Sequence, residues 1–449
     1  MLILFSVTVN RRTFLKAGAS AGALLLSHPA WCADPDKSKP SDEDILAQTK
    51  ARIERHRQGD GTVIVRDARG KAVRGAKVKV EQLRHDFLFG CNFFMFGRCG
   101  KPELEEQYRR RFEALLNYAT LAFYWAGYER VRGKPNYEYT DRVAAWTREH
   151  GITCKGHPLV WDHPAGSPRW LPDDPKEIER LSLARVHEIV SRYQGRIDIW
   201  DVVNEATHLT DMPNKTKMAR WAAGLGAVPY VEMHLKAARA ANPQATLLVN
   251  DYRLEPAYYK ILDSLREDGK LLFDTVGIQS HMHGGVWPLH KVWDTCDTYS
   301  KLGLPLHFTE TTILSGPRKG PGENWGATTP EGEARQAEWT AKFYTALFAH
   351  PAVTAITWWD FSDLGAWQRA PAGWLRHDMS PKPVYDRLTS LIKGDWWTKA
   401  ESPTDAHGQV ALRAFYGTHR ITAQLPGGQT VTKEVHWQRG NQNQFELTA

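Results

Sequence analysis

The chain has 449 residues, which exceeds one ordinary domain and leaves room for an accessory module beside a barrel of roughly 250–350 residues. The formal net charge is +7, but Lys and Arg are interspersed with Asp and Glu and form no basic run, so no nucleic-acid partner is predicted. The 18 Trp outnumber both Tyr and Phe, and a flat indole face suits stacking on sugar rings as well as core packing.

The N-terminal segment is predicted to direct export. Residues 10–16 read Asn-Arg-Arg-Thr-Phe-Leu-Lys, which resembles the twin-arginine motif. The apolar stretch at 17–26 is too short to span a membrane as a stable helix. We therefore expect residues 1–33 to be a signal peptide that engages the twin-arginine export machinery transiently, with no stable membrane insertion and a periplasmic or secreted location in a bacterium.

The cysteine pattern points to neither a metal nor a cofactor. No Cys pair or Cys/His cluster has the spacing of a zinc site. Cys91 and Cys99 are close enough in sequence for a loop disulfide. Proteins exported by the twin-arginine route fold in a reducing cytosol, however, and this favours free thiols.

Both ends of the mature chain predict short β-strands. A linker and a short charged helix are expected over 34–60, followed by an N-terminal β segment over 61–85 in which the turn Asp67–Gly70 predicts a hairpin. The C-terminal segment 399–449 also alternates apolar and polar residues, and its pattern resembles a transthyretin-like sandwich. Because isolated hairpins are marginal in water, we expect the two ends to pair into one β-sandwich-like module with the barrel inserted between them.

Between these ends, residues 86–398 alternate apolar strands with helical stretches such as 104–116 and 333–348. Eight such units predict a closed (β/α)₈ TIM barrel. An open doubly wound sheet is the alternative, but no Gly-rich phosphate loop follows the first strand. The predicted strands are 87–93, 119–125, 153–161, 197–204, 245–251, 275–280, 306–309 and 355–360.

Catalytic side chains of such barrels lie at the C-terminal ends of the strands. Glu205 and Glu310 follow the fourth and seventh predicted strands. Glycosidic cleavage needs one carboxyl to protonate the leaving oxygen and another to attack or to direct water. Amide, imidazole and indole groups near them can hold sugar hydroxyls and rings; each alone is more often structural, but together they form a candidate substrate site: His157, Trp161, Asn204, Gln279, His281, Trp359 and Trp367.

These positions also carry a family resemblance. Ile199-Trp200-Asp201-Val202-Val203-Asn204-Glu205 resembles the acid/base signature of glycoside hydrolase family 10, the endo-1,4-β-xylanases. Further segments agree in the same order, from about Phe87 to Trp397: Gly156–Trp161, Asn250–Tyr252, Gly277–His281, Phe308–Glu310, Trp359–Asp363 with Trp367, and Lys382–Tyr385.

The resemblance implies an activity and a role for each residue. It implies cleavage of internal β-1,4 linkages in xylan or a related plant or microbial β-glycan, by double displacement with retention. Glu205 would be the acid/base and Glu310 the nucleophile, with carboxyls about 5–5.5 Å apart. Asn204 would hold the 2-hydroxyl of the sugar in subsite −1, and the other candidate residues would line that subsite.

Three segments depart from the family pattern. Thr312 stands where the family usually has an Asp that supports His281, and 162–164 replace the usual His-Ser-Gln. Residues 120–124 replace the Glu-Asn-x-x-Lys run that binds the sugar in subsite −2. We therefore expect stacking to replace hydrogen bonds at subsite −2, through Leu121, Phe123, Tyr124 and Trp125, unless another loop such as 318–325 restores the lost contacts.

The sequence is also compatible with two other functions. One is a carbohydrate-binding barrel without catalysis, although such a protein need not retain both carboxylates. The other is a metal-dependent barrel hydrolase, which would need several His and carboxylate ligands converging on one point. Its candidate ligands are Asp162, His163, His281 and His283.

Overall fold

The computed structural model describes residues 39–209, 215–317 and 325–448. The predicted signal peptide at 1–33 and most of the loop 318–325 lie outside these residues. No helix within the described ranges is long and apolar enough to cross a lipid bilayer. Cys91, Cys99, Cys154 and Cys296 are buried free thiols, as predicted.

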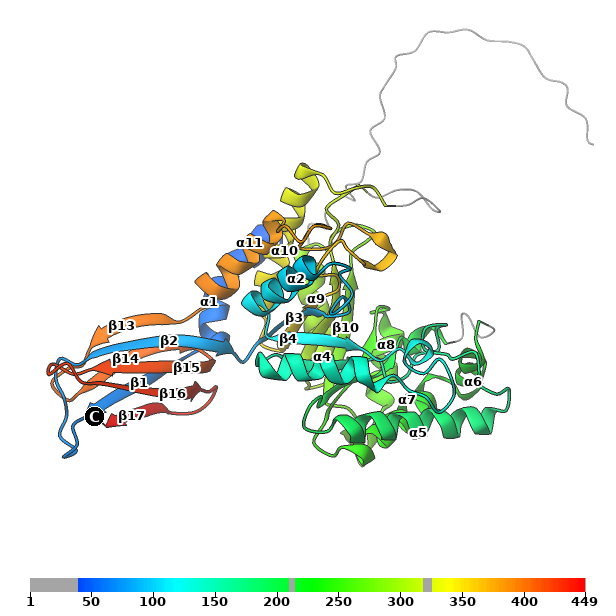
Figure 1. Ribbon diagram of the computed structural model, residues 1–449, viewed down its shortest axis with the longest axis horizontal. Helices are drawn as coiled ribbons and strands as arrows, with labels where there is room; N and C mark the ends of the chain where they lie inside the picture. The colour runs from blue at the N-terminus through cyan, green and yellow to red at the C-terminus, as the bar shows by residue number, and fades with distance from the viewer. Residues whose placement is uncertain (1–38, 210–214, 318–324, 449) are drawn as a thin grey trace, which may run out of the picture. The chain divides into compact units, whose positions relative to one another are not determined.

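The centre of the fold is a closed barrel of parallel strands in the order β10-β11-β12-β3-β4-β5-β6-β7 (Figure 1). This confirms the predicted (β/α)₈ architecture. Its strands are β3 (Leu88–Asn92), β4 (Tyr118–Ala122), β5 (Thr153–His157), β6 (Ile199–Asn204), β7 (Thr246–Asp251), β10 (Thr275–His281), β11 (Leu306–Thr312) and β12 (Val353–Trp358).

Helices connect the strands, and local capping explains where the longest of them begin. Asp174 accepts a hydrogen bond from the Lys176 backbone at the start of α5, and Thr329 does the same for Gly332 at the start of α10. A proline occupies the first turn of each, where its missing N–H costs nothing. The connecting helices are α2 (Pro102–Leu115), α3 (Trp125–Tyr128), α4 (Tyr137–Glu149), α5 (Pro175–Tyr193), α6 (Lys217–Leu225), α7 (Ala227–Ala241), α8 (Pro256–Ser264), α9 (Leu289–Ser300), α10 (Pro330–Phe348) and α11 (Pro383–Ser390).

Shorter elements complete the connections. The 3₁₀ turns η1 and η2 follow β6 and β12, and a π-helical turn, η3, follows α11. They span Ala206–His208, Trp367–Arg369 and Leu391–Asp395, and a small hairpin joins β8 (Arg266–Glu267) to β9 (Lys270–Leu271). Two predicted strands are too long: β4 ends at Ala122 because Trp125 begins α3, and β5 ends at His157.

The two ends of the described chain pair into two sheets, of order β14-β1-β17 and β13-β2-β15-β16. Figure 1 shows the blue N-terminal strands among the orange and red C-terminal ones. Val63, Val65, Val78, Val80 and Ile421 form a common core between the sheets, as in a β-sandwich. The strands are β1 (Gln58–Arg66), β2 (Lys77–His85), β13 (Lys399–Pro403), β14 (Gln409–Phe415), β15 (Gly417–Gln424), β16 (Thr430–Trp437) and β17 (Asn443–Thr448).

The predicted turn at Asp67–Gly70 forms and is closed by an antiparallel bridge between Arg66 and Ala72, but the predicted pairing of the two strands is wrong. β1 pairs with β14 and β17, whereas β2 pairs with β13 and β15, so the two strands lie in different sheets. Their alternation of apolar and polar residues fits either arrangement, because a hairpin and two facing strands bury the same pattern.

The end of the segment 34–60, which was expected to be a linker and a short helix, belongs to a strand instead. β1 already begins at Gln58, so Gly59 and Gly61 are strand residues. A Cβ at Gly61 would lie 2.2 Å from the ring of Trp437, whose Nε1 donates to the Gly59 carbonyl at 3.0 Å. The glycines therefore make room for an indole rather than a turn.

Helix α1 (Asp42–Arg57) joins this module to the barrel. Ser41 and Asp44 form a capping box at its start. At its other end the buried guanidinium of Arg57 donates to the carbonyls of Phe348 and His350, both at 2.6 Å, and of Val353, at 2.7 Å. These carbonyls lie between the last residue of α10 and the first residue of β12, so Arg57 fixes the entry of the chain against the barrel.

Candidate active site

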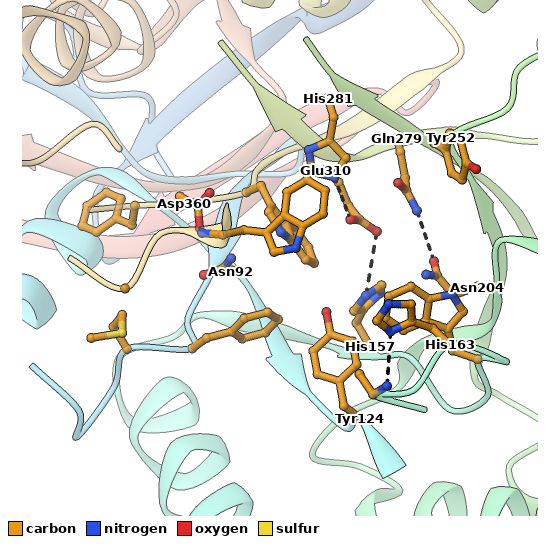
Figure 2. A pocket seen from close by; sticks show the side chains of 18 of the residues that line it. Asn92, Tyr124, His157, His163, Asn204, Tyr252, Gln279, His281, Glu310 and Asp360 are labelled. Atoms are coloured by element: carbon orange, nitrogen blue, oxygen red, sulfur yellow. Dashed lines mark hydrogen bonds and ion pairs between the residues drawn. The ribbon is translucent and has the colours of Figure 1, made fainter. Parts of the chain in front are cut away.

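One cavity of about 580 Å³ opens at the C-terminal ends of the barrel strands. Its size is in the usual range for a ligand pocket. All the site residues predicted from the sequence line it: His157, Trp161, Asn204, Glu205, Gln279, His281, Glu310, Trp359 and Trp367. Figure 2 shows residues from several different strands pointing into this space.

Glu310, in β11, is the more deeply buried of the two carboxyls. Its Oε1 accepts a hydrogen bond from Asn250 Nδ2 at 2.7 Å, and its Oε2 accepts one from His281 Nε2 at 3.1 Å. In Figure 2, His281 and His157 approach Glu310 from opposite sides. Burial alone would raise the pKa of Glu310, but His157 and His281 hold it below the ordinary value.

A chain of charges lies behind His157. His157 Nε2 is 3.8 Å from Glu310, while its Nδ1 donates to Asp201 Oδ2 at 2.7 Å. The same oxygen is 2.6 Å from Lys155 Nζ, and both Lys155 and Asp201 are fully buried. Burial would raise the pKa of Asp201, yet Lys155 and His157 lower it, so the buried carboxylate stays ionised. Lys155 also lowers the pKa of Glu310.

On the other side of Glu310, Thr312 supports His281. Its hydroxyl lies 2.9 Å from His281 Nδ1, at the position where the family pattern has an Asp. A hydroxyl can donate to Nδ1 and leave Nε2–H to donate to Glu310. His281 is therefore oriented without a carboxylate behind it, and the charge of Lys155, on the His157 side, helps to lower the pKa of Glu310.

Glu205 directly follows β6 and precedes η1. Its backbone is left-handed, with φ 61° and ψ 46°, a strained conformation for a non-glycine residue that is often found at functional sites. Oε1 accepts from Gln279 Nε2 and Oε2 from Trp161 Nε1, both at 3.0 Å. Burial and the charge of Glu310 raise the pKa of Glu205 to about 7.

An amide network connects the two carboxyls. Asn204 Oδ1 accepts from Asn250 Nδ2 at 2.8 Å and from Gln279 Nε2 at 3.3 Å. Asn250 also donates to Glu310, and Gln279 also donates to Glu205. The two carboxyls, one with a lowered and one with a raised pKa, are therefore held in fixed positions around a cavity.

Comparison with known proteins places this arrangement in a family. The sequence model described as "Glycosyl hydrolase family 10" matches residues 90–391. The chain belongs to glycosyl hydrolase family 10.

The relatives are distant in sequence. The chain is 28% identical to "Endo-1,4-beta-xylanase 5" of Arabidopsis thaliana over 303 residues, which cover 64% of this chain and 47% of that protein. It is 25% identical to "Anti-sigma-I factor RsgI6" of Acetivibrio thermocellus over 403 residues, covering 88% of this chain and 49% of that protein. The chain thus spans about half the length of these two relatives.

Solved structures share the barrel. Native xylanase 10B from Thermotoga maritima has a TM-score of 0.58 at 22% identity, with 69% of this chain and 96% of that one covered. Xylanase 10B from Thermotoga petrophila in complex with xylobiose gives 0.59 at 23% identity, with 69% and 95% covered. At such identities the likeness shows the common fold.

Aromatic side chains form the walls of this family 10 pocket. Trp359 meets His157 and His281 edge-on, with ring centroids 5.3 and 5.8 Å away. Trp367 is 45% exposed and lies over His281, at 4.9 Å between centroids. Asp360 Oδ1 accepts the Trp367 backbone N–H at 3.0 Å, which fixes this wall to the end of β12.

The expected stacking surface at subsite −2 is largely wrong. Leu121, Phe123 and Trp125 are buried in the barrel core, and Phe123 packs against Trp200 at 5.1 Å. Only Tyr124 of these four residues lines the cavity. The strand ends one residue before Phe123, so simple alternation no longer sets the direction of the side chains that follow.

The contact of Lys155 was not predicted from the sequence. Asp201, Asn250 and Asp360 belong to the family motifs, but no role was predicted for them. Lys155 stands two residues before His157 in the same strand, and this spacing places both on one face, so it was a usable signal. Burial, with a smaller contribution from Asp363, raises the pKa of Asp360 to about 7, which no sequence pattern reveals.

The candidate metal ligands have other partners. Asp162 lies 3.0 Å from His208, and His163 stacks on Trp161. His281 is hydrogen-bonded to Glu310, and His283 stacks on His281 with ring centroids 5.5 Å apart. Within residues 39–209, 215–317 and 325–448, no three His, Cys, Asp or Glu side chains are grouped so that they could hold a metal ion.

Proposed function

We propose that the protein is a retaining glycoside hydrolase that cleaves internal β-1,4 linkages of xylan or a related β-glycan. The observation that carries this proposal is the pair of buried carboxyls in one cavity whose pKa values are displaced in opposite directions. Such a pair separates a proton donor from a nucleophile at the same pH.

In the first step the Glu310 carboxylate attacks the anomeric carbon while Glu205 gives its proton to the glycosidic oxygen. The bond from the anomeric carbon to the leaving oxygen breaks, the aglycone leaves as an alcohol, and a glycosyl ester of Glu310 forms. His281 and Asn250 hold the attacking carboxylate in place until it reacts.

In the second step the Glu205 carboxylate takes a proton from water, and the resulting hydroxide oxygen attacks the anomeric carbon. The ester bond breaks and Glu310 regains its negative charge. While Glu310 is esterified, the charge that raised the pKa of Glu205 is absent, so Glu205 can act as a base. Two inversions give net retention.

The substrate class rests on similarity and on the pocket lining. The relatives named endo-1,4-beta-xylanase and a fold neighbour solved with xylobiose favour a β-1,4-xylan. Aromatic walls from Trp161, Trp359 and Trp367 suit stacking on pyranose rings. The large cavity and the absence of the usual subsite −2 donors extend the proposal to other β-glycans.

Early-time NMR of the reaction with aryl β-xylobioside tests the mechanism. The first product should be the β-anomer, and Glu205→Ala should cleave a 2,4-dinitrophenyl glycoside with acceleration by azide. Azide replaces water at a site that no longer needs a general base. Appearance of the α-anomer first would show that the mechanism is inverting and that these roles are wrong.

A non-catalytic carbohydrate-binding barrel is the second candidate. It is kept because the relative that matches more of this chain than the xylanase does is named as an anti-sigma factor and not as a hydrolase. The two candidates differ in turnover. A protein that binds xylo-oligosaccharides but cleaves no aryl glycoside, with Glu205 and Glu310 intact, would be the binding protein.

We also propose that the protein is exported. The support is the twin-arginine pattern at 10–16 followed by a short apolar stretch. Fusion of residues 1–33 to a reporter that folds in the cytosol should carry the reporter to the periplasm, and replacing both Arg11 and Arg12 with Lys should retain it in the cytosol.

A further inference from the structure

A buried ion pair lies directly behind Glu205. His208 ends η1, and its Nε2 is 3.0 Å from Asp162 Oδ1, with both side chains 4% exposed. Its other ring nitrogen, Nδ1, is 3.7 Å from Glu205 Oε2. This nitrogen is buried and forms no hydrogen bond with any residue in the described part of the chain. A buried polar atom without a partner is costly, so its orientation toward a reacting carboxyl calls for an explanation.

Neighbouring contacts fix this pair from both sides. Asp162 directly follows Trp161, which donates to the same Glu205 oxygen, and the Asp162 carbonyl accepts from Thr216 Oγ1 at 2.7 Å. Within η1, Thr207 donates to Asp251 through its backbone N–H at 3.0 Å and through its hydroxyl at 2.8 Å. The imidazole is therefore held beside Glu205 rather than placed there by a flexible loop.

The charged surroundings favour the imidazolium form. Burial alone would lower the pKa of His208, but the hydrogen bond and charge of Asp162, then Glu205 and Asp251, raise it above its ordinary value. His208 also lowers the pKa of His163, and the ring of Tyr252 lies beside His208 with centroids 6.1 Å apart. In return, His208 lowers the pKa of Glu205, opposing burial and Glu310.

We propose that His208 is a positioning residue for the acid/base: Asp162 keeps it protonated, and its Nδ1–H stabilises the Glu205 carboxylate whenever Glu205 has given up its proton. This inference rests on the proposed function, because it takes Glu205 to be the acid/base. In the first step the proton passes from Glu205 to the leaving oxygen, and the new negative charge forms 3.7 Å from the imidazole nitrogen. The imidazolium keeps its own proton throughout.

This arrangement resolves a conflict in the requirements on Glu205. The nearby Glu310 charge keeps Glu205 protonated and ready, but the same charge makes it a weak acid. A cation beside its carboxylate makes proton donation easier without removing the proton beforehand. The effect should be largest for poor leaving groups, which need the proton most.

His208→Gln tests this, because the amide retains a donor toward Asp162 and cannot carry a charge. The alkaline limb of kcat/KM should move up by about one pH unit, since loss of the cation raises the pKa of Glu205. At pH 6, kcat/KM on an unactivated xylo-oligosaccharide should fall by about tenfold or more, while that on 2,4-dinitrophenyl β-xylobioside should change by less than about twofold. His187→Gln, at an exposed position of α5, is the matched control and should leave both unchanged.

Asp162→Asn provides a second variant that keeps the hydrogen-bonding geometry. Removing the carboxylate lowers the pKa of His208, so the alkaline limb should move in the same direction by a smaller amount. Nitrogen-15 NMR of wild-type protein labelled at histidine should show His208 as imidazolium at pH 7, whether or not either variant folds.

The outcomes separate this inference from the proposed function. A neutral His208 in the wild-type protein would overturn the inference, as would an equal loss on both substrates with an unmoved alkaline limb. In either case Glu205→Ala with azide still reports on the acid/base role. If Glu205→Ala keeps the wild-type kcat/KM on the unactivated oligosaccharide, the proposed function and this inference are both wrong.

Discussion

The surroundings of Glu310 and Glu205 differ more than the residues themselves. Around Glu310, His157, His281 and Lys155 each lower its pKa, and Asn250 donates a hydrogen bond to it. Around Glu205, the charges of Asp162 and His208 cancel, and the remaining contacts come from an amide and an indole. One carboxyl is therefore stabilised as an anion and the other as an acid, in the same cavity.

The groups that surround each carboxyl, rather than the extent of its burial, determine the direction in which its pKa is shifted. Both groups are buried, and burial alone would raise both pKa values. The direction reverses only at Glu310, where His157, His281 and Lys155 together outweigh burial. Each of the following experiments removes one side of this asymmetry.

The largest effect is expected from Glu310→Gln, which removes the nucleophile and its charge while keeping the volume. Turnover should fall by about 10⁴-fold or more, because the amide cannot form the ester. The pKa of Glu205 should also fall from about 7, since the Glu310 charge is the second-largest contribution raising it. Carbon-13 NMR of labelled glutamate would measure this shift. An unshifted Glu205 would show that burial alone sets its pKa and that the two carboxyls are not coupled.

A smaller but still large effect is expected from Lys155→Met. Its removal leaves Asp201 with one partner and raises the pKa of Glu310. Glu310 must be ionised to attack. As the pH is lowered, Lys155→Met should therefore lose activity at a higher pH than the wild-type protein does. Breaking a buried ion pair also costs about 3–5 kcal/mol of unfolding free energy.

The acid limb of kcat/KM and chemical denaturation measure the two consequences of Lys155→Met separately. Lys236→Met is the matched control, because Lys236 pairs with Glu232 and Glu267 at the surface. It should change neither the acid limb nor the denaturation midpoint appreciably. An acid limb that stays in place in folded Lys155→Met would mean that His157 and His281 suffice to keep Glu310 ionised.

The sequence predicts the parts of this asymmetry that depend on order along the chain. Eight alternations of strand and helix predict the barrel, and polar residues at the strand ends predict where Glu205 and Glu310 converge. The Lys155–Asp201–His157 chain could not be predicted in the same way, because it depends on side chains that meet across the β5–β6 pairing.

Direction and pairing account for the remaining errors. Phe123 was expected in the pocket because it lies near a strand end, but the backbone turns into α3 and directs it into the core. β1 and β2 were expected to pair because they are adjacent in sequence, whereas strands from the far end of the chain lie beside each of them. The alternation of apolar and polar residues indicates neither where the chain turns after a strand nor which distant strand pairs with it.

Trp367→Ala should produce a moderate effect on the Glu310 side of the pocket. The indole lies over His281 and His283, at 4.9 and 5.2 Å between ring centroids, and contributes an exposed wall for a sugar ring. Loss of one aromatic contact should raise KM by roughly tenfold. The pH limbs should stay in place, because Trp367 carries no charge. A moved acid limb would show instead that the indole sets the position of His281.

The smallest effect should come from lengthening the substrate on the glycone side. Tyr124 replaces the last residue of the family's Glu-Asn-x-x-Lys run, and it packs against His157 at 5.5 Å and Phe94 at 5.9 Å. Phe94, Met95 and Leu364 also line the cavity, and their side chains cannot donate a hydrogen bond to a second sugar. A hydrogen bond contributes about 0.5–1.5 kcal/mol net, and the loss of two or three removes most of the gain from filling subsite −2.

We therefore expect kcat/KM to rise by less than about tenfold from aryl β-xyloside to aryl β-xylobioside, because stacking alone supplies the added affinity. Tyr124→Lys should increase this ratio by restoring a donor where the family pattern has one. The aryl β-xyloside is the internal control, because it does not reach subsite −2 and should respond less to the substitution. A ratio of several hundred in the wild-type protein would show that other residues bind the second sugar by hydrogen bonds. The opposite pKa shifts of Glu310 and Glu205 would be unaffected by that result, but the glycone side would be an ordinary xylan subsite.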